Sequence, residues 1–221
     1  SASVILCRIT DSDQRKYDLA HQDSWGFDMF PEVTLVAPTR EDVQRMAEWL
    51  NDPEVSTVWY GVGDDGKPLH TGYNPEALVA GSQDDWDQVF SDESRAIFSI
   101  YNDDGEHIGE GQLVIEWTLL EARADLLVGR KDLWHHHFGT SGLIGLLDHA
   151  FGPLGLHRVW VDVPEYNEPG MQMVQHVGFV VEGHLRKTHR KNDEWYDSSV
   201  LGLLAEEYPR RRARLTENAV T

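Results

Sequence analysis

The stretch from residue 128 to residue 179 constrains the fold more than any other part of the sequence. A strand is expected to end at Val128, followed by a short loop, a helix from Thr140 to Phe151 and a second strand that begins at Arg158. The first N–H groups of an α-helix have no partner inside the helix, and their summed dipole favours negative charge. The loop before this helix therefore predicts a binding site for a phosphate or pyrophosphate.

The remaining segments predict a mixed α/β architecture of short elements. Thr39-Arg40-Glu41-Asp42 has the form of a capping box, so a helix is expected to begin there and to stop at Asn51-Asp52-Pro53. Asn74-Pro75 begins a second helix, and a short helix spans residues 167–177. Strands are expected at 33–37, 96–101, 107–120, 122–128, 158–163, 179–188 and 195–204, the last two joined across Asn192-Asp193. The order β-α-α-β-β-β-α-β-α-β-β is typical of a mixed α/β fold.

The composition indicates one full-sized domain. At 221 residues the chain is long enough for its own hydrophobic core. No run approaches the ~18 apolar residues of a membrane span, and the start lacks the pattern of a secretory signal. Cys7 is the only cysteine, which excludes an internal disulfide and a cysteine-built metal site. A cytoplasmic location is therefore expected.

The charge balance restricts the class of partner. The formal net charge is −19, from 38 acidic and 19 basic residues. Such a field disfavours nucleic acid and anionic membrane surfaces, and it favours cationic partners such as amines. A second interpretation is that the charge serves solubility or adaptation to salt.

Short motifs occur along the chain in the order and spacing of one protein family. They are Leu35, Pro38-Thr39, Glu41-Asp42, Trp49 to Val55, Ile108-Gly109, Gly155 to Val159, Asn167-Glu168, Gly178-Phe179, Glu182-Gly183 and Leu185-Arg186. As an ordered set they resemble the GCN5-related N-acetyltransferase (GNAT) superfamily, and specifically the RimJ/RimL-like branch, which acetylates protein N-termini and small amines. The resemblance divides the chain into an N-terminal extension (1–32), a GNAT acyltransferase domain (33–208) and a basic C-terminal tail (209–221).

The resemblance implies a central, mostly antiparallel twisted sheet with flanking helices, in which two parallel strands splay apart. These strands would be 122–129 and 158–163, and acetyl-CoA would lie in the wedge between them. An amine would attack the thioester directly, helped by positioning, a general base and hydrogen bonds to the oxyanion. The residues expected to bind CoA are Leu126, Leu127, Val128, His135, His136, His137, Phe138, Gly139, Thr140 and Asn167.

Three consecutive histidines depart from the family pattern, which usually has glycine at positions 135 and 137. Histidine resists the positive φ that glycine permits. Three outcomes are open: the amides still point at the phosphate, the imidazoles themselves donate to it, or CoA binding is impaired. A metal site is not expected, because adjacent histidines seldom converge on one ion.

Val174 is a second departure, because many family members have a tyrosine there that protonates the departing thiolate. Tyr166 lies close in sequence and Tyr196 is in the terminal hairpin, although packing of both rings in the core or at its rim is the favoured interpretation. Candidate bases are Glu110, Glu116, Asp125 and Asp162, with His70 and His21 as further options. Glu116 is the first choice, because burial beside Trp117 would raise its pKa. The predicted catalytic residues are therefore Glu116, Asp162 and Tyr166.

Aromatic residues crowd the N-terminal half, where the family builds its acceptor pocket. They are Trp25, Trp49, Trp59, Tyr60 and Trp86. Aromatic walls with acidic groups suit a cationic amine, whereas Trp49 and Trp86 are equally explained as core residues of amphipathic helices.

The sequence thus predicts an acetyl-CoA-dependent N-acetyltransferase acting on a primary amine, which could be a small amine, an antibiotic or a protein N-terminus. The partner is expected to be a cationic small molecule or peptide, and a homodimer is possible. Two alternatives stay open at this point: an acyl-CoA-binding module of the same fold with little turnover, and a transferase that uses a longer acyl-CoA.

Overall fold

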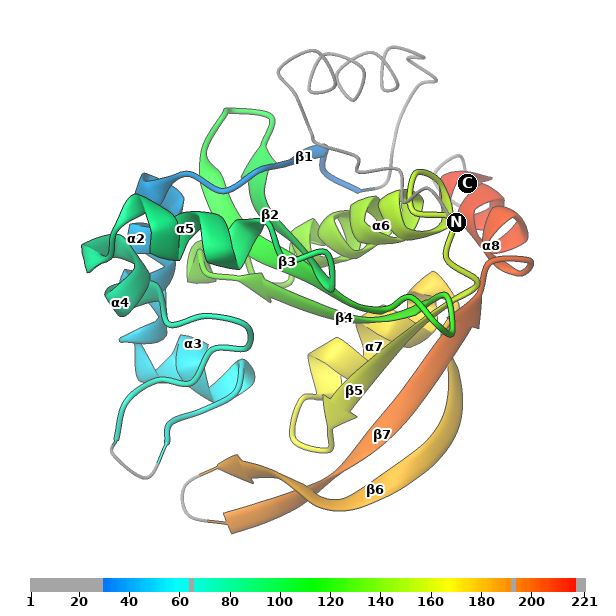
Figure 1. Cartoon of the computed structure of the whole chain (residues 1–221). Coiled ribbons are helices and arrows are strands. Elements are labelled where there is room, and N and C mark those ends of the chain that lie inside the picture. The colour runs from blue at the N-terminus through cyan, green and yellow to red at the C-terminus, as the bar shows by residue number, and fades with distance from the viewer. Residues whose placement is uncertain (1–29, 64–65, 192–193, 218–221) are drawn as a thin grey trace.

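Seven strands form a single sheet in the order β1-β2-β3-β4-β5-β7-β6 in the computed structural model of the chain (Figure 1). The structure describes residues 30–63, 66–191 and 194–217. The strands are β1 (Val33–Val36), β2 (Arg95–Asn102), β3 (His107–Glu116), β4 (Glu121–Val128), β5 (Arg158–Pro164), β6 (Val180–Lys191) and β7 (Glu194–Leu204). All neighbours in the sheet are antiparallel except β4 and β5, so the predicted fold class is confirmed.

Helices cover both faces of this sheet. They are α2 (Arg40–Leu50), α3 (Pro53–Val58), α4 (Pro75–Ala80), α5 (Gln83–Phe90), α6 (Phe138–Phe151), α7 (Glu168–Val177) and α8 (Tyr208–Glu217), with a single 3₁₀ turn, η1 (Lys131–Leu133). On β3, Gly111 faces Leu146 of α6, whereas its neighbours Glu110 and Gln112 contact the 70–73 segment. Because side chains alternate along a strand, α6 and the 70–73 segment lie on opposite faces.

The parallel strands β4 and β5 separate soon after they meet. Their pairing covers only three positions, and the last is Arg123 opposite Trp160. β4 continues to Val128 and stays paired with β3, while β5 continues to Pro164 and stays paired with β7. From residue 124 onward the edge of β4 that faces β5 therefore has no strand partner, and its backbone groups need another one.

Helix α6 fills the space behind this splayed pair. Its sequence is apolar on almost every side, as expected of a helix buried in a core. Gly142 allows the closest approach, because a Cβ there would stand 2.8 Å from Leu126 Cδ1. The main core joins α6 to β4, β5, β7 and α7, and it also includes Tyr208 and Leu215 of α8.

Several predicted boundaries need correction. Asn51-Asp52-Pro53 does not end the helical region, because Asp52 caps α3 and accepts from the N–H of Glu54 at 2.9 Å. The helix that begins after Asn74 is interrupted, because Ser82 and Asp85 form a new capping box that starts α5. The strand expected over 107–120 stops at Glu116 and is followed by a turn in which Leu120 has φ 50°. The predicted turn at Asn192-Asp193 lies outside the described residues.

Among the described residues, the structure contains no helix that is both long enough and apolar enough to span a bilayer.

Candidate active site

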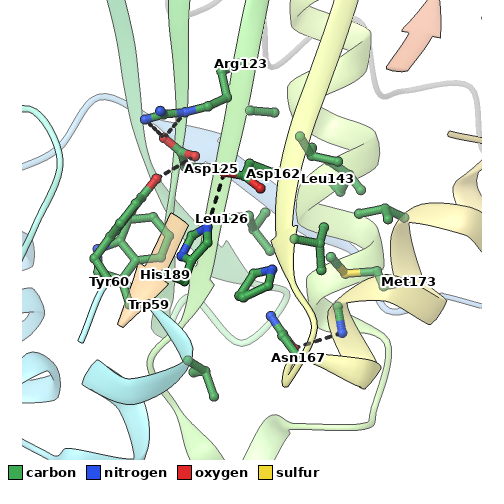
Figure 2. Close-up of a pocket in the computed structure, with 17 residues that line it drawn as sticks. Trp59, Tyr60, Arg123, Asp125, Leu126, Leu143, Asp162, Asn167, Met173 and His189 are labelled. Atoms are coloured by element: carbon green, nitrogen blue, oxygen red, sulfur yellow. Dashed lines mark hydrogen bonds and ion pairs between the residues drawn. The ribbon is translucent and has the colours of Figure 1, made fainter. Parts of the chain in front are cut away.

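A cavity of about 110 Å³ lies where β4 and β5 separate (Figure 2). Residues 123–126 of β4 and 161–164 of β5 form its two side walls. The first turns of α7 and Leu143 of α6 close its inner end, and the segment 58–60 with His189 closes the opposite side. The splayed pair of strands therefore encloses a small space that α7, α3 and the β6–β7 hairpin complete.

The inner part of the cavity is apolar. Leu126, Leu143, Met173 and Val174 line it, and Val174 is almost fully buried. Asn167 stands at the edge of this part as the N-cap of α7, where its side chain accepts from the N–H of Gly170 at 3.0 Å. This end of the cavity suits a small apolar group.

The opposite part is polar, and Asp125 is held firmly in it. The Tyr60 hydroxyl donates to Asp125 Oδ1 at 2.8 Å, and Arg123 Nη2 donates to Oδ2 at 2.9 Å (Figure 2). Burial, followed by the negative charge of Asp125, raises the pKa of Tyr60 well above its usual value, so this hydroxyl stays protonated. Both carboxylate oxygens of Asp125 are thus occupied by donors.

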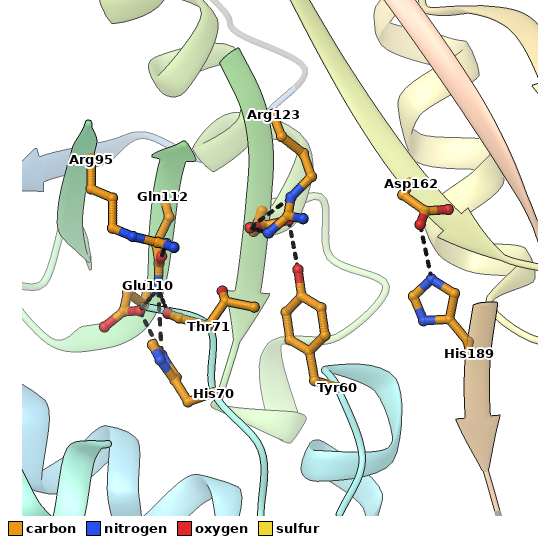
Figure 3. A network of polar contacts seen from close by, with 10 residues as sticks. Tyr60, His70, Thr71, Arg95, Glu110, Gln112, Arg123, Asp162 and His189 are labelled. Atoms are coloured by element: carbon orange, nitrogen blue, oxygen red, sulfur yellow. Dashed lines mark hydrogen bonds and ion pairs between the residues drawn. The ribbon is translucent and has the colours of Figure 1, made fainter. Parts of the chain in front are cut away.

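Asp162 on β5 differs because only one of its oxygens is occupied. His189 Nε2 lies 3.2 Å from Oδ2, whereas Oδ1 is buried and has no hydrogen-bond partner among the described residues (Figure 3). Burial raises the pKa of Asp162, but the hydrogen bond from His189, the neighbouring Ser198 hydroxyl and the nearby positive charges outweigh it, so the pKa lies below its usual value. The cavity therefore presents a charged carboxylate oxygen that lacks a donor.

Helix packing fixes the aromatic wall of the cavity. Met46 and Leu50 of α2, Val55 of α3 and Leu127 of β4 form a cluster around Trp59, and Tyr60 packs against it. Trp59 and Tyr60 meet edge to face with ring centroids 5.0 Å apart. The short helix α3, which the sequence did not predict, thus places both rings beside the splayed strands.

The loop before α6 adopts the positive φ angles that its histidines were expected to resist. His135 and His137 both have φ 65°, the left-handed region that glycine enters most readily. The first hydrogen bond within α6 runs from Ser141 N to His137 O, so the N–H groups of residues 138–140 have no helical partner. At Gly139 a Cβ would stand 3.1 Å from Met173 Sδ, so this position has little room for a side chain. The loop accordingly keeps the geometry that suits a phosphate.

The structure brings some predicted site residues together and separates others. Asp162, Asn167 and Leu126 line the cavity, whereas Tyr166 does not and instead packs edge to face on Tyr196 at 5.2 Å. The expected partial burial of Glu116 is wrong: its side chain is exposed and accepts from the N–H of Thr118 at 3.0 Å. It stands opposite Glu121, at the end of β4 where the parallel strands are still joined. The geometry therefore does not favour its catalytic role.

Glu110 and His70 belong to a separate buried network (Figure 3). His70 Nε2 lies 2.9 Å from Glu110 Oε1, Gln112 donates to the same oxygen at 2.8 Å, and Tyr73 donates to Oε2. Burial raises the pKa of Glu110, but the charge of His70 and these three hydrogen bonds outweigh it and lower the pKa. None of these four residues lines the cavity.

Of the aromatic residues expected in the acceptor pocket, some line the cavity and others pack elsewhere. Trp59 and Tyr60 line the cavity, while Trp49 packs in the α2–α3 cluster and Trp86 packs on Phe90 at 4.5 Å. Trp25 and His21 lie outside the described residues. His189 and Arg123 were not among the predicted site residues. His189 reaches Asp162 only through the packing of the β6–β7 hairpin, whereas Arg123 stands two residues before Asp125 on the same face of β4, a spacing that is visible in the sequence.

A cavity between splayed parallel strands, next to a helix whose first amides are free, defines an acyl-CoA-binding fold. A family model described as the acetyltransferase (GNAT) domain matches residues 32–180. The chain belongs to this family and, as predicted, is an acetyl-CoA-dependent N-acetyltransferase.

Solved structures support the fold. The chain resembles the spermidine N-acetyltransferase of Vibrio cholerae in complex with CoA and spermine, with TM-score 0.65 and 20% identity over 80% of this chain and 98% of that one. A dodecameric structure of the same Vibrio enzyme gives TM-score 0.65 and 20% identity over 81% of this chain and 97% of that one. No curated protein matched the sequence.

No group of three or more His, Cys, Asp or Glu side chains in the described part of the chain is arranged to hold a metal ion.

Proposed function

We propose that the acceptor is a cationic aliphatic primary amine and that it is acetylated in the cavity between β4 and β5. The observation that carries this proposal is the buried Asp162 Oδ1, which lines the cavity and has no donor among the described residues. A charged carboxylate oxygen in such a place is satisfied by an N–H donor, and an ammonium group is the strongest one. The ring of Tyr60 and the net charge of −19 favour the same class of ligand.

The residues present fit the CoA part of acetyl-CoA, which supplies the acetyl group as an activated thioester when bound. The free N–H groups of residues 138–140 would hold the pyrophosphate at the start of α6. The unpaired edge of β4 at Leu126, Leu127 and Val128 would hold the pantetheine arm through backbone hydrogen bonds. Imidazole donors to the pyrophosphate could be added by three exposed side chains that come just before α6 in the sequence, His135, His136 and His137.

The residues of the chain then have separate tasks. Asp162 and the ring of Tyr60 hold the ammonium group, while Leu126, Met173 and Val174 exclude water from the acetyl group. Val174 offers no proton, so the departing sulfur receives its proton from water or from the amine. Asn167 keeps the first turn of α7 in place beside the cavity.

The size of the cavity favours acetyl over longer acyl groups. The cavity volume of about 110 Å³ is well below the ~300–1,000 Å³ of pockets that hold drug-sized ligands. An acetyl group and an amino group fill such a space. A hexanoyl thioester would require Met173 or Val174 to move, so we expect turnover to fall from acetyl-CoA to hexanoyl-CoA.

The structural neighbours acetylate spermidine, which agrees with a cationic aliphatic acceptor. At 20% identity they indicate the fold, and the choice of a polyamine-like acceptor rests on the carboxylates of this chain. Three finer predictions stay predictions: membership of the RimJ/RimL-like branch, a homodimeric assembly and a cytoplasmic location.

A thiol-release assay with acetyl-CoA and matched acceptors tests the proposal. We expect kcat/KM to be at least tenfold higher for 1,4-diaminobutane than for an uncharged peptide with a free N-terminus. Asp162→Asn should raise the KM for the diamine, because a hydrogen bond to a charged group contributes about 1.5–3 kcal/mol, or roughly 10- to 150-fold. Glu165→Gln is the matched control, since it also removes one negative charge at the end of β5 but its side chain is exposed.

A preference for the peptide would contradict the assignment of the acceptor. CoA binding without thiol release from any amine would show that the chain is an acyl-CoA-binding module.

A further inference from the structure

His189 is a titratable group of the cavity to which the proposed function gives no task. Its Nε2 faces Asp162 Oδ2 at 3.2 Å, and its side chain is 13% exposed at the wall of the cavity. Its other ring nitrogen, Nδ1, makes no hydrogen bond to any described residue. We propose that His189 is the general base of acetyl transfer and that Asp162 holds its ring in position; this inference rests on the proposed function.

Other carboxylates of the site are less suited to take a proton. Both oxygens of Asp125 already accept hydrogen bonds, from Tyr60 and from Arg123. Glu110 is buried in its own network outside the cavity, and Glu116 is exposed at the joined end of β4 and β5. An imidazole also titrates nearer to neutral pH than a carboxylate, which suits general base catalysis.

The fold places His189 by an irregularity in β6. The pairing of β6 with β7 shifts between Leu185 and His189, and Lys187 between them has φ 57°. Such bulges redirect side chains and occur often beside active sites. The β6–β7 hairpin packs directly on the 58–61 segment, because Arg190 O lies 3.2 Å from the point where a Cβ on Gly61 would stand. This contact keeps His189 over the cavity.

The hydrogen bond to Asp162 also selects the reactive nitrogen. An ionised carboxylate only accepts, so Nε2 carries the hydrogen in neutral His189 and Nδ1 carries the lone pair. The low pKa of Asp162 agrees with an ionised partner. This is the histidine–carboxylate arrangement that orients an imidazole for proton transfer.

The step balances without a further reactant. The acceptor enters as an ammonium ion, and Nδ1 of His189 takes one of its protons. The nitrogen lone pair forms the bond to the thioester carbonyl carbon, and the electron pair of the broken carbon–sulfur bond leaves on sulfur. A second proton passes from nitrogen to that sulfur, and His189 returns its proton to water. The products are the acetamide, free CoA thiol and one proton.

Titratable and charged groups face His189 from every neighbouring element. These are Asp162 on β5, Asp125 and Arg123 on β4, Tyr60 after α3, Tyr196 opposite on β7, and Arg190 and Lys191 on β6 itself. The opposing charges of Asp125 and Arg123 are paired with each other, which leaves Asp162 as the nearest unpaired charge.

The test compares His189→Gln with His184→Gln, using acetyl-CoA and 1,4-diaminobutane. Glutamine keeps an N–H donor toward Asp162 but cannot take a proton. We expect His189→Gln to lower kcat by about 10²- to 10⁴-fold, to leave CoA affinity unchanged by calorimetry, and to remove the rise of kcat between about pH 5.5 and 7.5. His184 is exposed on the same strand and bonds Ser199 Oγ at 3.0 Å, so its variant should keep the wild-type rate and pH profile.

A second variant separates loss of the base from loss of structure. His189→Ala leaves space beside Asp162. Added imidazole should raise the kcat of this variant at least tenfold over its value without imidazole. Wild-type kcat and pH profile in His189→Gln would overturn the proposal, and so would an effect confined to KM. Absence of turnover in the wild-type protein would instead overturn the proposed function itself.

Discussion

The two neighbours His135 and His136 allow a direct test of strain in the loop before α6. Both side chains are exposed, and neither forms a hydrogen bond or ring contact with a described residue. His135 has φ 65°, whereas His136 is not among the described residues with positive φ. Replacing each in turn by glycine therefore makes the same chemical change in two different backbone conformations.

The expected difference follows from the backbone alone. At either position glycine lowers the free energy of unfolding by about 0.5–1 kcal/mol, because the unfolded chain becomes more flexible. This cost is the same for both variants. Only in His135→Gly is the strain of a left-handed histidine removed, which should raise the free energy of unfolding by about 1–2 kcal/mol. For a domain of 150–250 residues each kcal/mol shifts Tm by about 2–4 °C, so His135→Gly should melt about 2–8 °C above His136→Gly.

Differential scanning calorimetry of the two variants, without CoA, measures this difference. His137→Gly should show a smaller gain, because it also loses the edge-to-face contact with Phe30 at 5.5 Å. A His135→Gly variant that melts at or below the temperature of His136→Gly would refute the strain argument.

Three further predictions concern single residues. Gly139→Val should weaken CoA binding at least tenfold in calorimetry, about 1.4 kcal/mol, because its side chain would meet Met173 at the phosphate loop; unchanged affinity would contradict the placement of CoA. Glu116→Gln should leave kcat and its pH profile at wild-type values in the thiol-release assay, and a large loss would return Glu116 to the site. Glu110→Gln should lower the free energy of unfolding near pH 6. At that pH Glu110 is ionised, and its pKa is lowered in the folded protein, so the ionised carboxylate stabilises the fold. Because this contribution disappears as pH falls below about 4, the gap in urea unfolding between variant and wild type should narrow at pH 3, and a constant gap would contradict it.

Local signals predicted the parts of the fold that depend on a few adjacent residues. Thr39 and Asp42 form the expected capping box, and the short helix expected over 167–177 is α7, with Asn167 as its N-cap. The strand–loop–helix–strand stretch also matches, because its signals lie in consecutive residues, and the parallel pair is the one that the family resemblance implied. The wedge and the loop His135–Thr140 could therefore be located from the sequence.

The residues that complete the cavity could not be located in that way. His189 reaches Asp162 only because β6 shifts its pairing before it and the hairpin packs on the 58–61 segment. Glu116 was chosen for its neighbour Trp117, yet the indole of Trp117 donates to Glu93 O and leaves both side chains exposed. Contacts between segments far apart in the sequence decided both cases.

A crystal structure of the protein with CoA and a diamine would show directly where the acceptor and the pyrophosphate bind. We expect one amine nitrogen to lie about 2.7–3.2 Å from Asp162 Oδ1 and the pyrophosphate to lie on the N–H groups of residues 138–140. A diamine bound outside the cavity between β4 and β5, with Asp162 Oδ1 still without a donor, would contradict this expectation.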